Sequence, residues 1–497
     1  MRGIAAGYAE NDEVSLEMAP EEMRRFGQGV IESLIRHYTT VREQRVVKVT
    51  NRDETEALLA EPAPEVGTGL DDLLAEFEEK VVAHMSHVDH PRMFAFVPGS
   101  GTFVGAMGDA LAAGYNIYAG TWIESSAAHQ LELVVIDWFR TWLGLPAAAG
   151  GTLLSGGSVA NLTGLVLARE ARLGDMREDG VIYAGELAHS CVDRAARILG
   201  FRPDQLRKIP SDASLKLDMS ALRQAVEEDS AAGRRPFCIV ANAGDTSTGS
   251  IDPLPQIADL CRARGLWMHV DAAYGGFAVL DERGRRLMDG IEKADSIALD
   301  PHKWLYTPFE AGCILVRDFR TLYDAFHILP DYLVDVAGGP RNVNMCDHGI
   351  QLSRSSRALK IWLAIKHFGL SRYRAVISRT LDLARHAESL LEAAPEVEVV
   401  TPAVLSVVTF RYVPGAESAA GPAFDEAAVE RINEEIRRRI WESGRAMLSS
   451  TRVRGRYVLR ICVVNHNTRQ KDVEELVRLV AELGPQVTRE LAGAKDT

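Results

Sequence analysis

One lysine, Lys303, stands in a setting that suits covalent chemistry. It lies in the run Asp300-Pro-His-Lys-Trp304, between two apolar segments, 295–299 and 311–316, whose pattern is typical of buried strands. Desolvation at the mouth of a sheet disfavours the charged ammonium, and a neutral lysine amine can form a Schiff base with a carbonyl. An isolated lysine is more often a surface residue whose stem covers apolar neighbours, so this interpretation depends on the rest of the chain.

Other polar residues follow the predicted strands of the same region. Short apolar strands are expected at 181–186, 237–242, 266–270, 296–299 and 312–316, with helical patterns between several of them. This alternation predicts an α/β fold with a mostly parallel sheet, in which ligands collect at the carboxyl ends of the strands. The residues that follow successive strands are His189, Asp245 and Thr246, Asp271 and Ala273, and His302 and Lys303. Their recurrence at one edge of the sheet predicts a site there.

A glycine turn, Ser155-Gly-Gly-Ser158, leads into an apolar helical pattern. Exposed backbone N–H groups and the positive end of a helix bind phosphate, although the same sequence also suits a simple helix cap. A phosphate cradle, a Schiff-base lysine and an aspartate on a neighbouring strand form the set that pyridoxal 5′-phosphate (PLP) requires. Lys303 would take the aldehyde, Gly157 and Ser158 the phosphate, and Asp271 the ring nitrogen.

In these residues the chain resembles the PLP-dependent group II decarboxylases, and within them the aromatic-L-amino-acid decarboxylases. The resemblance covers roughly residues 15 to 480. The motifs that carry it, in the family's order and spacing, are His90-Pro-x-x-Phe-Ala95, Ser155-Gly-Gly-Ser158, Ala188-His-Ser190, His269-Val-Asp-Ala-Ala273, Asp300-Pro-His-Lys-Trp304 and Asp331-Tyr-Leu333.

The resemblance implies the PLP-dependent transferase fold type I, which is aspartate-aminotransferase-like, with a homodimer packed through N-terminal helices. It implies a cofactor site made of Gly157, Ser158, His189, Thr246, Asp271, Ala273, Asp300, His302 and Lys303. His189 would stack on the cofactor ring, with Ala273 on the opposite face. Tyr332, in an irregular segment at 326–346, matches a loop tyrosine that reaches the neighbouring subunit's site and protonates the α-carbon after CO₂ leaves. The catalytic residues would be Lys303, Tyr332, His189 and Asp271.

The implied activity is decarboxylation of an L-amino acid, expected to be aromatic, to the amine and CO₂. The substrate pocket is expected to be lined by Phe96, Val97, Pro98, Tyr118, Phe309 and Ser353. Ser353 falls where plant relatives carry serine for phenolic substrates and glycine for indole ones. Arg92 could bind the distal carboxylate of a glutamate-like substrate, so such substrates remain possible. Arg460 could bind a substrate carboxylate, but the sequence favours a structural ion pair.

Other activities remain open at this stage. An aldehyde synthase would combine decarboxylation with oxidative deamination, and such relatives often carry phenylalanine in place of Tyr332. An aminotransferase would need a carboxylate-binding arginine, and a cofactor-binding dimer without catalysis would not need the full residue set. Two departures from relatives bear on cofactor affinity: Asp300 replaces an asparagine and Asp245 a threonine, and either carboxylate could repel the phosphate unless it is hydrogen-bonded.

Composition limits the possible partners and locations. The chain has 497 residues and a net charge of −13, which argues against nucleic acid or an anionic membrane as partner. Six scattered cysteines, an acidic N-terminal stretch and the absence of a long apolar run predict a cytoplasmic protein with reduced thiols and no bound metal. We expect an N-terminal dimerisation arm at 1–75, a large PLP-binding domain at 76–385 and a small C-terminal α+β domain at 386–497.

Overall fold

The computed structural model describes residues 16–174, 178–328, 331, 341–415 and 424–493. The chain divides into two compact units, one holding Met1–Gln44 and Lys48–Ser86, the other Arg45–Val47 and His87–Thr497. The predicted three-part domain division stays a prediction. Each of the six cysteines, all of them among the described residues, is a free thiol. No helix in the described ranges has the length and apolar character needed to cross a bilayer.

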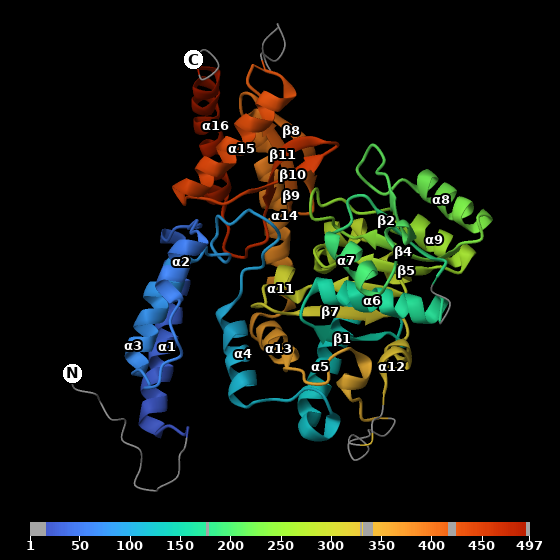
Figure 1. Ribbon diagram of the computed structural model, residues 1–497, viewed down its shortest axis with the longest axis horizontal. Coiled ribbons are helices and arrows are strands. Elements are labelled where there is room, and N and C mark those ends of the chain that lie inside the picture. Colours follow the sequence, from blue (N-terminus) through green and yellow to red (C-terminus); the bar gives the residue numbers. More distant parts are fainter. Residues whose placement is uncertain (1–15, 175–177, 329–330, 332–340, 416–423, 494–497) are drawn as a thin grey trace. The chain divides into compact units, whose positions relative to one another are not determined.

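The first unit is helical (Figure 1). Helix α1 covers Pro20–Thr40 and begins with proline at a position where its missing N–H costs nothing. Helix α2 covers Arg52–Leu59, and α3 covers Leu70–Glu76. After α3 the chain forms a π-helix at Phe77–Val81 and a 3-10 helix at Val82–His84. Helix α1 is amphipathic, but no residue of this helix is buried.

The second unit is built on a seven-stranded sheet in the order β1-β7-β6-β5-β4-β2-β3. The strands are β1 Gly150–Leu154, β2 Gly180–Gly185, β3 Leu206–Ile209, β4 Arg235–Asn242, β5 Trp267–Asp271, β6 Ser296–Leu299 and β7 Gly312–Val316. Neighbours from β3 to β6 pair in parallel, whereas β7 pairs antiparallel with both β6 and β1. The expected mostly parallel sheet is therefore confirmed, and β1 runs in the same direction as β6.

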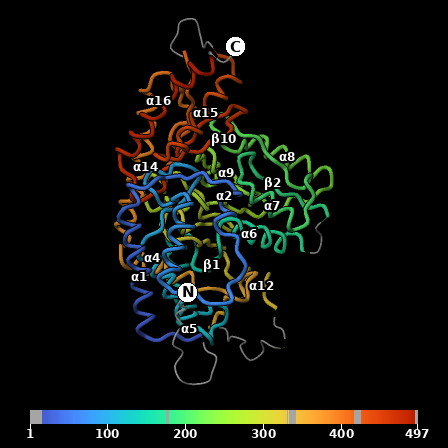
Figure 2. The backbone as a smooth tube through the Cα atoms, turned by 60° about the vertical axis from the view of Figure 1, so that its left-hand side comes forward, coloured from blue at the N-terminus to red at the C-terminus, as the bar shows by residue number. Residues whose placement is uncertain are grey.

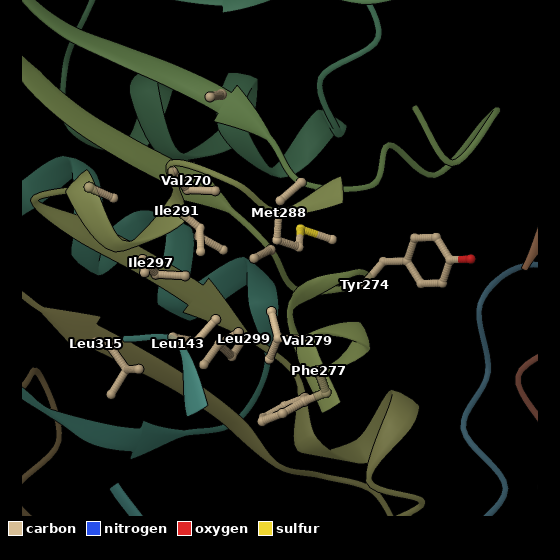
Figure 3. Close-up of a cluster of buried hydrophobic side chains, with 14 of the residues drawn as sticks. Leu143, Val270, Tyr274, Phe277, Val279, Met288, Ile291, Ile297, Leu299 and Leu315 are labelled. Carbon is tan, nitrogen blue, oxygen red and sulfur yellow. The ribbon is translucent and has the colours of Figure 1, made fainter. Parts of the chain in front are cut away.

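Alternating side chains of these strands enter two separate cores, as the period of a strand requires. Ile297 and Leu299 face one core while Ala298 faces the other. The helices on the first face are α5 Trp122–Trp142, α8 Met219–Ala231, α9 Leu254–Arg264 and α13 Arg357–Phe368, and those on the second are α6 Gly157–Arg172, α7 Ser190–Ile198 and α12 Arg320–Phe326. Figure 3 shows part of the first core, with Val270, Ile297 and Leu315 from adjacent strands. Both faces of the sheet are thus covered by helices, so a ligand can reach the sheet at the ends of its strands.

The C-terminal part contains a second sheet, wholly antiparallel, in the order β10-β11-β9-β8. Its strands are β8 Val397–Val404, β9 Val407–Tyr412, β10 Ser449–Val453 and β11 Arg456–Cys462. Helices α14 Leu370–Ala393, α15 Glu426–Ser443 and α16 Gln470–Gly493 share a hydrophobic core with it (Figure 2). This confirms the expected small α+β region at the C-terminus.

Candidate active site

Five strands of the large sheet place functional side chains at the same end of the sheet. Because β1, β2, β4, β5 and β6 run in the same direction, the segments that follow them meet at their carboxyl ends. A cavity of about 310 Å³ lies there, and its lining includes all nine residues predicted to bind a cofactor: Gly157, Ser158, His189, Thr246, Asp271, Ala273, Asp300, His302 and Lys303. The structure brings this set together, while the role of each residue stays a prediction.

Lys303 lies in the short helix α11, Pro301–Trp304, directly after β6. Its Nζ is 3.0 Å from Oδ2 of Asp300, with which it forms an ion pair inside the cavity wall. The loop that contains Gly99 presses against this turn, since a Cβ at Gly99 would lie 1.5 Å from the carbonyl oxygen of His302. Glycine is therefore required at this position by the close approach of the backbone to the lysine turn.

A chain of hydrogen bonds connects the sheet to the glycine turn. Ser296 Oγ accepts from Trp267 Nε1 at 2.8 Å and lies 2.8 Å from His269 Nδ1. The other ring nitrogen of His269 is 2.9 Å from Asn161 Oδ1, and Asn161 Nδ2 donates to the carbonyl of Gly157 at 2.8 Å. Burial lowers the pKa of His269 to about 3, so the ring is neutral and can donate through Nε2 to Asn161. This relay fixes the first turn of α6, where the cavity meets the helix N-terminus.

Asp271 and His189 are oriented by backbone N–H groups. Asp271 Oδ1 accepts from the N–H of Ala273 at 3.1 Å, and its Oδ2 lies 4.0 Å from the thiol sulfur of Cys191. Burial raises the pKa of Cys191 to about 12, which keeps this thiol protonated. His189 caps α7 by accepting the N–H of Cys191 at Nδ1, so the neutral imidazole carries its proton on Nε2.

The two unusual carboxylates differ in how they are satisfied. Asp245 accepts hydrogen bonds from the backbone N–H groups of Ser247, Thr248 and Ser250 and from the Thr248 hydroxyl. The pKa of Asp245 is nevertheless raised, because burial outweighs these bonds. Asp300 has its ion pair to Lys303, but its Oδ1 is buried and has no hydrogen-bond partner among the described residues. Either carboxylate was expected to repel the phosphate unless it is hydrogen-bonded. Asp245 is fully hydrogen-bonded, whereas Asp300 is only partly so.

The predicted substrate-pocket residues do not line this cavity. They are Phe96, Val97, Pro98, Tyr118, Phe309 and Ser353, all of them described. The ring of Phe309 lies 4.9 Å from that of His302 and is 55% exposed, and Phe96 is 58% exposed. The Tyr118 hydroxyl donates to the carbonyl of Leu352, next to the exposed Ser353. Their role in substrate binding stays a prediction, and Tyr332 lies outside the described residues.

One expectation is wrong. Arg460 was expected to form a structural ion pair, but it contacts no carboxylate among the described residues. It donates through Nη1 to the carbonyl of Phe96 at 2.7 Å and to Ser449 Oγ at 3.2 Å. Its Nε and Nη2 are buried without a partner in the described part of the chain. A loop carbonyl and the hydroxyl of the first residue of β10 supply the neutral acceptors that hold this side chain, so a carboxylate partner is not needed for its position.

Sequence reasoning missed several residues that line the cavity: Asn161, Cys191, Asn242 and Tyr274. Asn161 could have been found from its place one helical turn after Gly157, on the same face of α6. Cys191 follows His189 by two residues, at the start of a helix whose position was not predicted. Asn242 ends β4 and Tyr274 follows β5, so the rule that located Asp271 applies to both.

A covered α/β sheet with a lysine, an aspartate and a helix N-terminus around one cavity defines the class of enzymes that bind PLP through a lysine. Comparison with known proteins makes the class specific. Residues 53–413 match the model of the pyridoxal-dependent decarboxylase conserved domain. Over 475 residues the chain is 38% identical to an aromatic-L-amino-acid decarboxylase of Bacillus atrophaeus, covering 95% of this chain and 98% of that one.

Two further relatives extend the comparison. A phenylacetaldehyde synthase of Arabidopsis thaliana is 30% identical over 478 residues, which cover 94% of this chain and 96% of that one. The crystal structure of Oryza sativa TDC with PLP and tryptamine superposes with a TM-score of 0.89 at 29% identity, covering 96% of this chain and all of that one. The chain belongs to the pyridoxal-dependent decarboxylase family. It is a PLP-dependent carboxy-lyase of fold type I.

The residues of the cavity fit this cofactor. The N-terminus of α6 has no side-chain cap among the described residues, so its first backbone N–H groups, beside Ser158, can bind the phosphate. Lys303 presents an amine for the aldehyde, and Asp271 presents a carboxylate whose Oδ2 has only a weak thiol partner among the described residues. The carboxylate of Asp300 lies beside Gly157 and opposes an anion in the cradle.

Proposed function

We propose that this enzyme converts an aromatic L-amino acid to the corresponding amine and CO₂. Strongest support comes from the 38% identity, over nearly the whole chain, to a protein named for that activity. Relatives named tryptophan decarboxylase in rice and tyrosine decarboxylase in Petroselinum crispum are 30% and 34% identical to the chain, which points to the same class of substrate.

Each residue of the cavity has a proposed task. Lys303 would hold the aldehyde end of the cofactor, Asp271 the ring nitrogen, and Gly157 with Ser158 the phosphate. When bound, PLP supplies withdrawal of electrons from the substrate α-carbon. Asp271 would face the ring nitrogen and hold its proton, and burial would strengthen such an ion pair. His189 would lie against the ring and could donate through Nε2, because its Nδ1 accepts the backbone N–H of Cys191.

The surroundings of the cavity favour an aromatic over an acidic side chain. Phe309 exposes an apolar ring beside His302 of the lysine turn, and Phe96 is an exposed aromatic residue three positions before Gly99, whose backbone approaches that turn. Arg92, the residue that kept glutamate-like substrates open, donates its Nε to the carbonyl of Arg445 at 2.6 Å and does not line the cavity. Arg460, with two buried nitrogens unpaired among the described residues, is proposed to hold the substrate α-carboxylate.

We further propose a cytoplasmic homodimer in which the loop carrying Tyr332 completes the neighbouring site. The absence of buried residues on α1 supports this, because an amphipathic helix of 21 residues needs a surface on which to bury its apolar stripe. Tyr332 would deliver a proton to the α-carbon after CO₂ leaves. The division of the chain at residues 75 and 385 is kept as part of this proposal.

The test is turnover by purified protein with PLP and a panel of L-amino acids: tyrosine, DOPA, phenylalanine, tryptophan, histidine and glutamate. Amine, aldehyde and CO₂ are followed by mass spectrometry. We expect amine from at least one aromatic substrate, lost in Lys303→Ala. Amine from glutamate alone would contradict the proposed substrate class.

An aldehyde synthase is the second candidate, because the phenylacetaldehyde synthase of Arabidopsis is 30% identical. The presence of Tyr332 favours the amine. In the same assay Tyr332→Phe should shift product from amine to aldehyde and ammonia. Aldehyde as the main product of the unsubstituted enzyme would reverse this assignment.

A further inference from the structure

Asp300 places a buried negative charge beside the phosphate cradle. The residue is 3% exposed, and its Oδ2 lies 3.0 Å from Lys303 Nζ and 3.6 Å from His302 Nε2. Its Oδ1 is buried and finds no donor among the described residues. A buried carboxylate oxygen without a donor is costly, so this atom is suited to a partner that arrives with the ligand.

The carboxylate lies directly against the N-terminus of α6. A Cβ at Gly157 would be 2.9 Å from Asp300 Oδ2, and a Cβ at Gly156 would be 4.0 Å from Oδ1. The N-terminus of a helix attracts an anion through its free N–H groups and its dipole. In this structure the Asp300 carboxylate lies at that end of the helix, where the phosphate is proposed to bind. Two like charges this close in a buried site repel each other strongly.

We propose that Asp300 takes up one proton from solvent when the phosphate group binds, and that the protonated carboxyl donates a hydrogen bond through Oδ1 to a phosphate oxygen. The O–H bond of the carboxylic acid is the bond that forms, its proton comes from solvent, and the added proton offsets one negative charge of the ligand. The inference rests on the proposed phosphate position at Gly157 and Ser158. It is independent of which amino acid is the substrate.

Four titratable groups face Asp300 or interact with it electrostatically. Lys303 and His302 lie on α11, Cys191 on α7 and Cys313 on β7. Burial raises the pKa of both thiols, so they are already protonated and accept no proton. Lys303 is the cation of the ion pair and has no site for a proton either. His302 is the competitor, because burial lowers its pKa and leaves its Nε2 facing the carboxylate.

The experiment measures protons taken up on binding. Apoenzyme is titrated with 4-deoxypyridoxine 5′-phosphate, which keeps the phosphate and ring but lacks the aldehyde, so Lys303 stays free. Calorimetry at several pH values between 6.5 and 8.5, in buffers of different ionisation enthalpy, gives the proton count and the dissociation constant. The phosphate's own titration is common to all variants, so the comparison between variants isolates the protein group.

We expect the unsubstituted enzyme to take up about one proton more per bound ligand than Asp300→Asn does. For each unit that the pH rises, its dissociation constant should therefore rise about tenfold more than the dissociation constant of Asp300→Asn. Asp300→Asn should bind more tightly than the unsubstituted enzyme at pH 8.5. His302→Gln should keep the extra proton. Equal proton counts in the unsubstituted enzyme and Asp300→Asn would overturn the inference, as would loss of the extra proton in His302→Gln alone.

Ser158→Ala separates this inference from the proposal on which it rests. It should weaken binding at every pH and leave the proton count unchanged. If Ser158→Ala leaves affinity unchanged, the proposed phosphate position is wrong and the inference falls with it. If Ser158→Ala weakens binding while Asp300→Asn leaves the proton count unchanged, the phosphate position stands and only the inference is refuted.

Discussion

Replacing Asn161 by leucine should weaken cofactor binding although Asn161 is not itself one of the predicted cofactor residues. The side chain is buried and joins His269 Nε2, at 2.9 Å, to the Gly157 carbonyl, at 2.8 Å. The leucine removes both hydrogen bonds and leaves the imidazole N–H in an apolar core without an acceptor, at a cost of about 1–3 kcal/mol. If that cost is expressed at the first turn of α6, the dissociation constant of PLP should rise roughly 5- to 150-fold.

The assay is a spectroscopic titration of apoenzyme with PLP, run beside urea denaturation of the apoenzyme. Thr163→Val is the matched control: this buried residue lies on the same helix, but its hydroxyl donates only within the helix, to the carbonyl of Val159 at 2.8 Å. The control should leave the dissociation constant within about twofold, because valine removes one bond within the helix and leaves no buried donor without an acceptor. Unchanged cofactor affinity in Asn161→Leu, together with lower stability, would show that the relay supports the fold and not the cradle.

Three further predictions test other parts of the structure. Arg354→Met leaves Glu132 buried without the guanidinium at 2.6 Å and should lower the free energy of unfolding by about 3–5 kcal/mol in urea, whereas a loss below about 1 kcal/mol would contradict the pairing. Burial lowers the pKa of His269 to about 3 in the folded protein, against about 6.5 in the unfolded chain. As the pH drops below 6.5, this histidine is therefore protonated in the unfolded chain but not in the folded protein, and the free energy of unfolding falls. This residue alone should cost about 2 kcal/mol between pH 6.5 and 5.0, and His269→Gln should show a correspondingly smaller loss over that range; equal losses would refute the assignment. Gly99→Ala, whose Cβ would meet the His302 carbonyl at 1.5 Å, should displace the lysine turn and lower turnover at least about a hundredfold, and full activity would refute the close packing.

The central strands could be predicted because they are continuous apolar runs, as both-face burial requires. All five expected strands are present to within two residues at each end. Strand β1 was not among the expected strands, and it begins with two glycines, which are uncommon in strands. The structure gives a reason for these glycines: a Cβ at Gly151 would lie 2.1 Å from the Ile314 carbonyl of β7, and one at Gly150 would meet the ring of Phe319. Strand β3 was missed because it is a short edge strand with exposed Lys208.

Much of the cofactor set could be located because parallel strands place their carboxyl ends together, so the order of the strands predicted that His189, Thr246, Asp271, Ala273, His302 and Lys303 would meet, whereas Gly157 and Ser158 followed from the glycine turn and Asp300 from the family resemblance. The second layer of the site could not be predicted in this way. Asn161, His269 and Ser296 come from a helix and two strands, and their contacts depend on side-chain directions across the sheet. The ion pair predicted for Arg460 was wrong for a similar reason. Its guanidinium donates to the backbone carbonyl of Phe96, and a sequence does not indicate which backbone carbonyls accept such bonds.

The position of β7 has a consequence for how the enzyme is assembled during folding. Strand β1, which leads into the glycine turn, pairs only with β7 in the described sheet, and Gly150 faces Val316 across the ladder. Contacts this distant in sequence form slowly, because a long loop must close before they are rewarded. The phosphate cradle therefore cannot meet the lysine turn until β7 is inserted between β1 and β6. During refolding, capture of PLP should lag behind the formation of helices, and its absorbance would report the closure of the sheet.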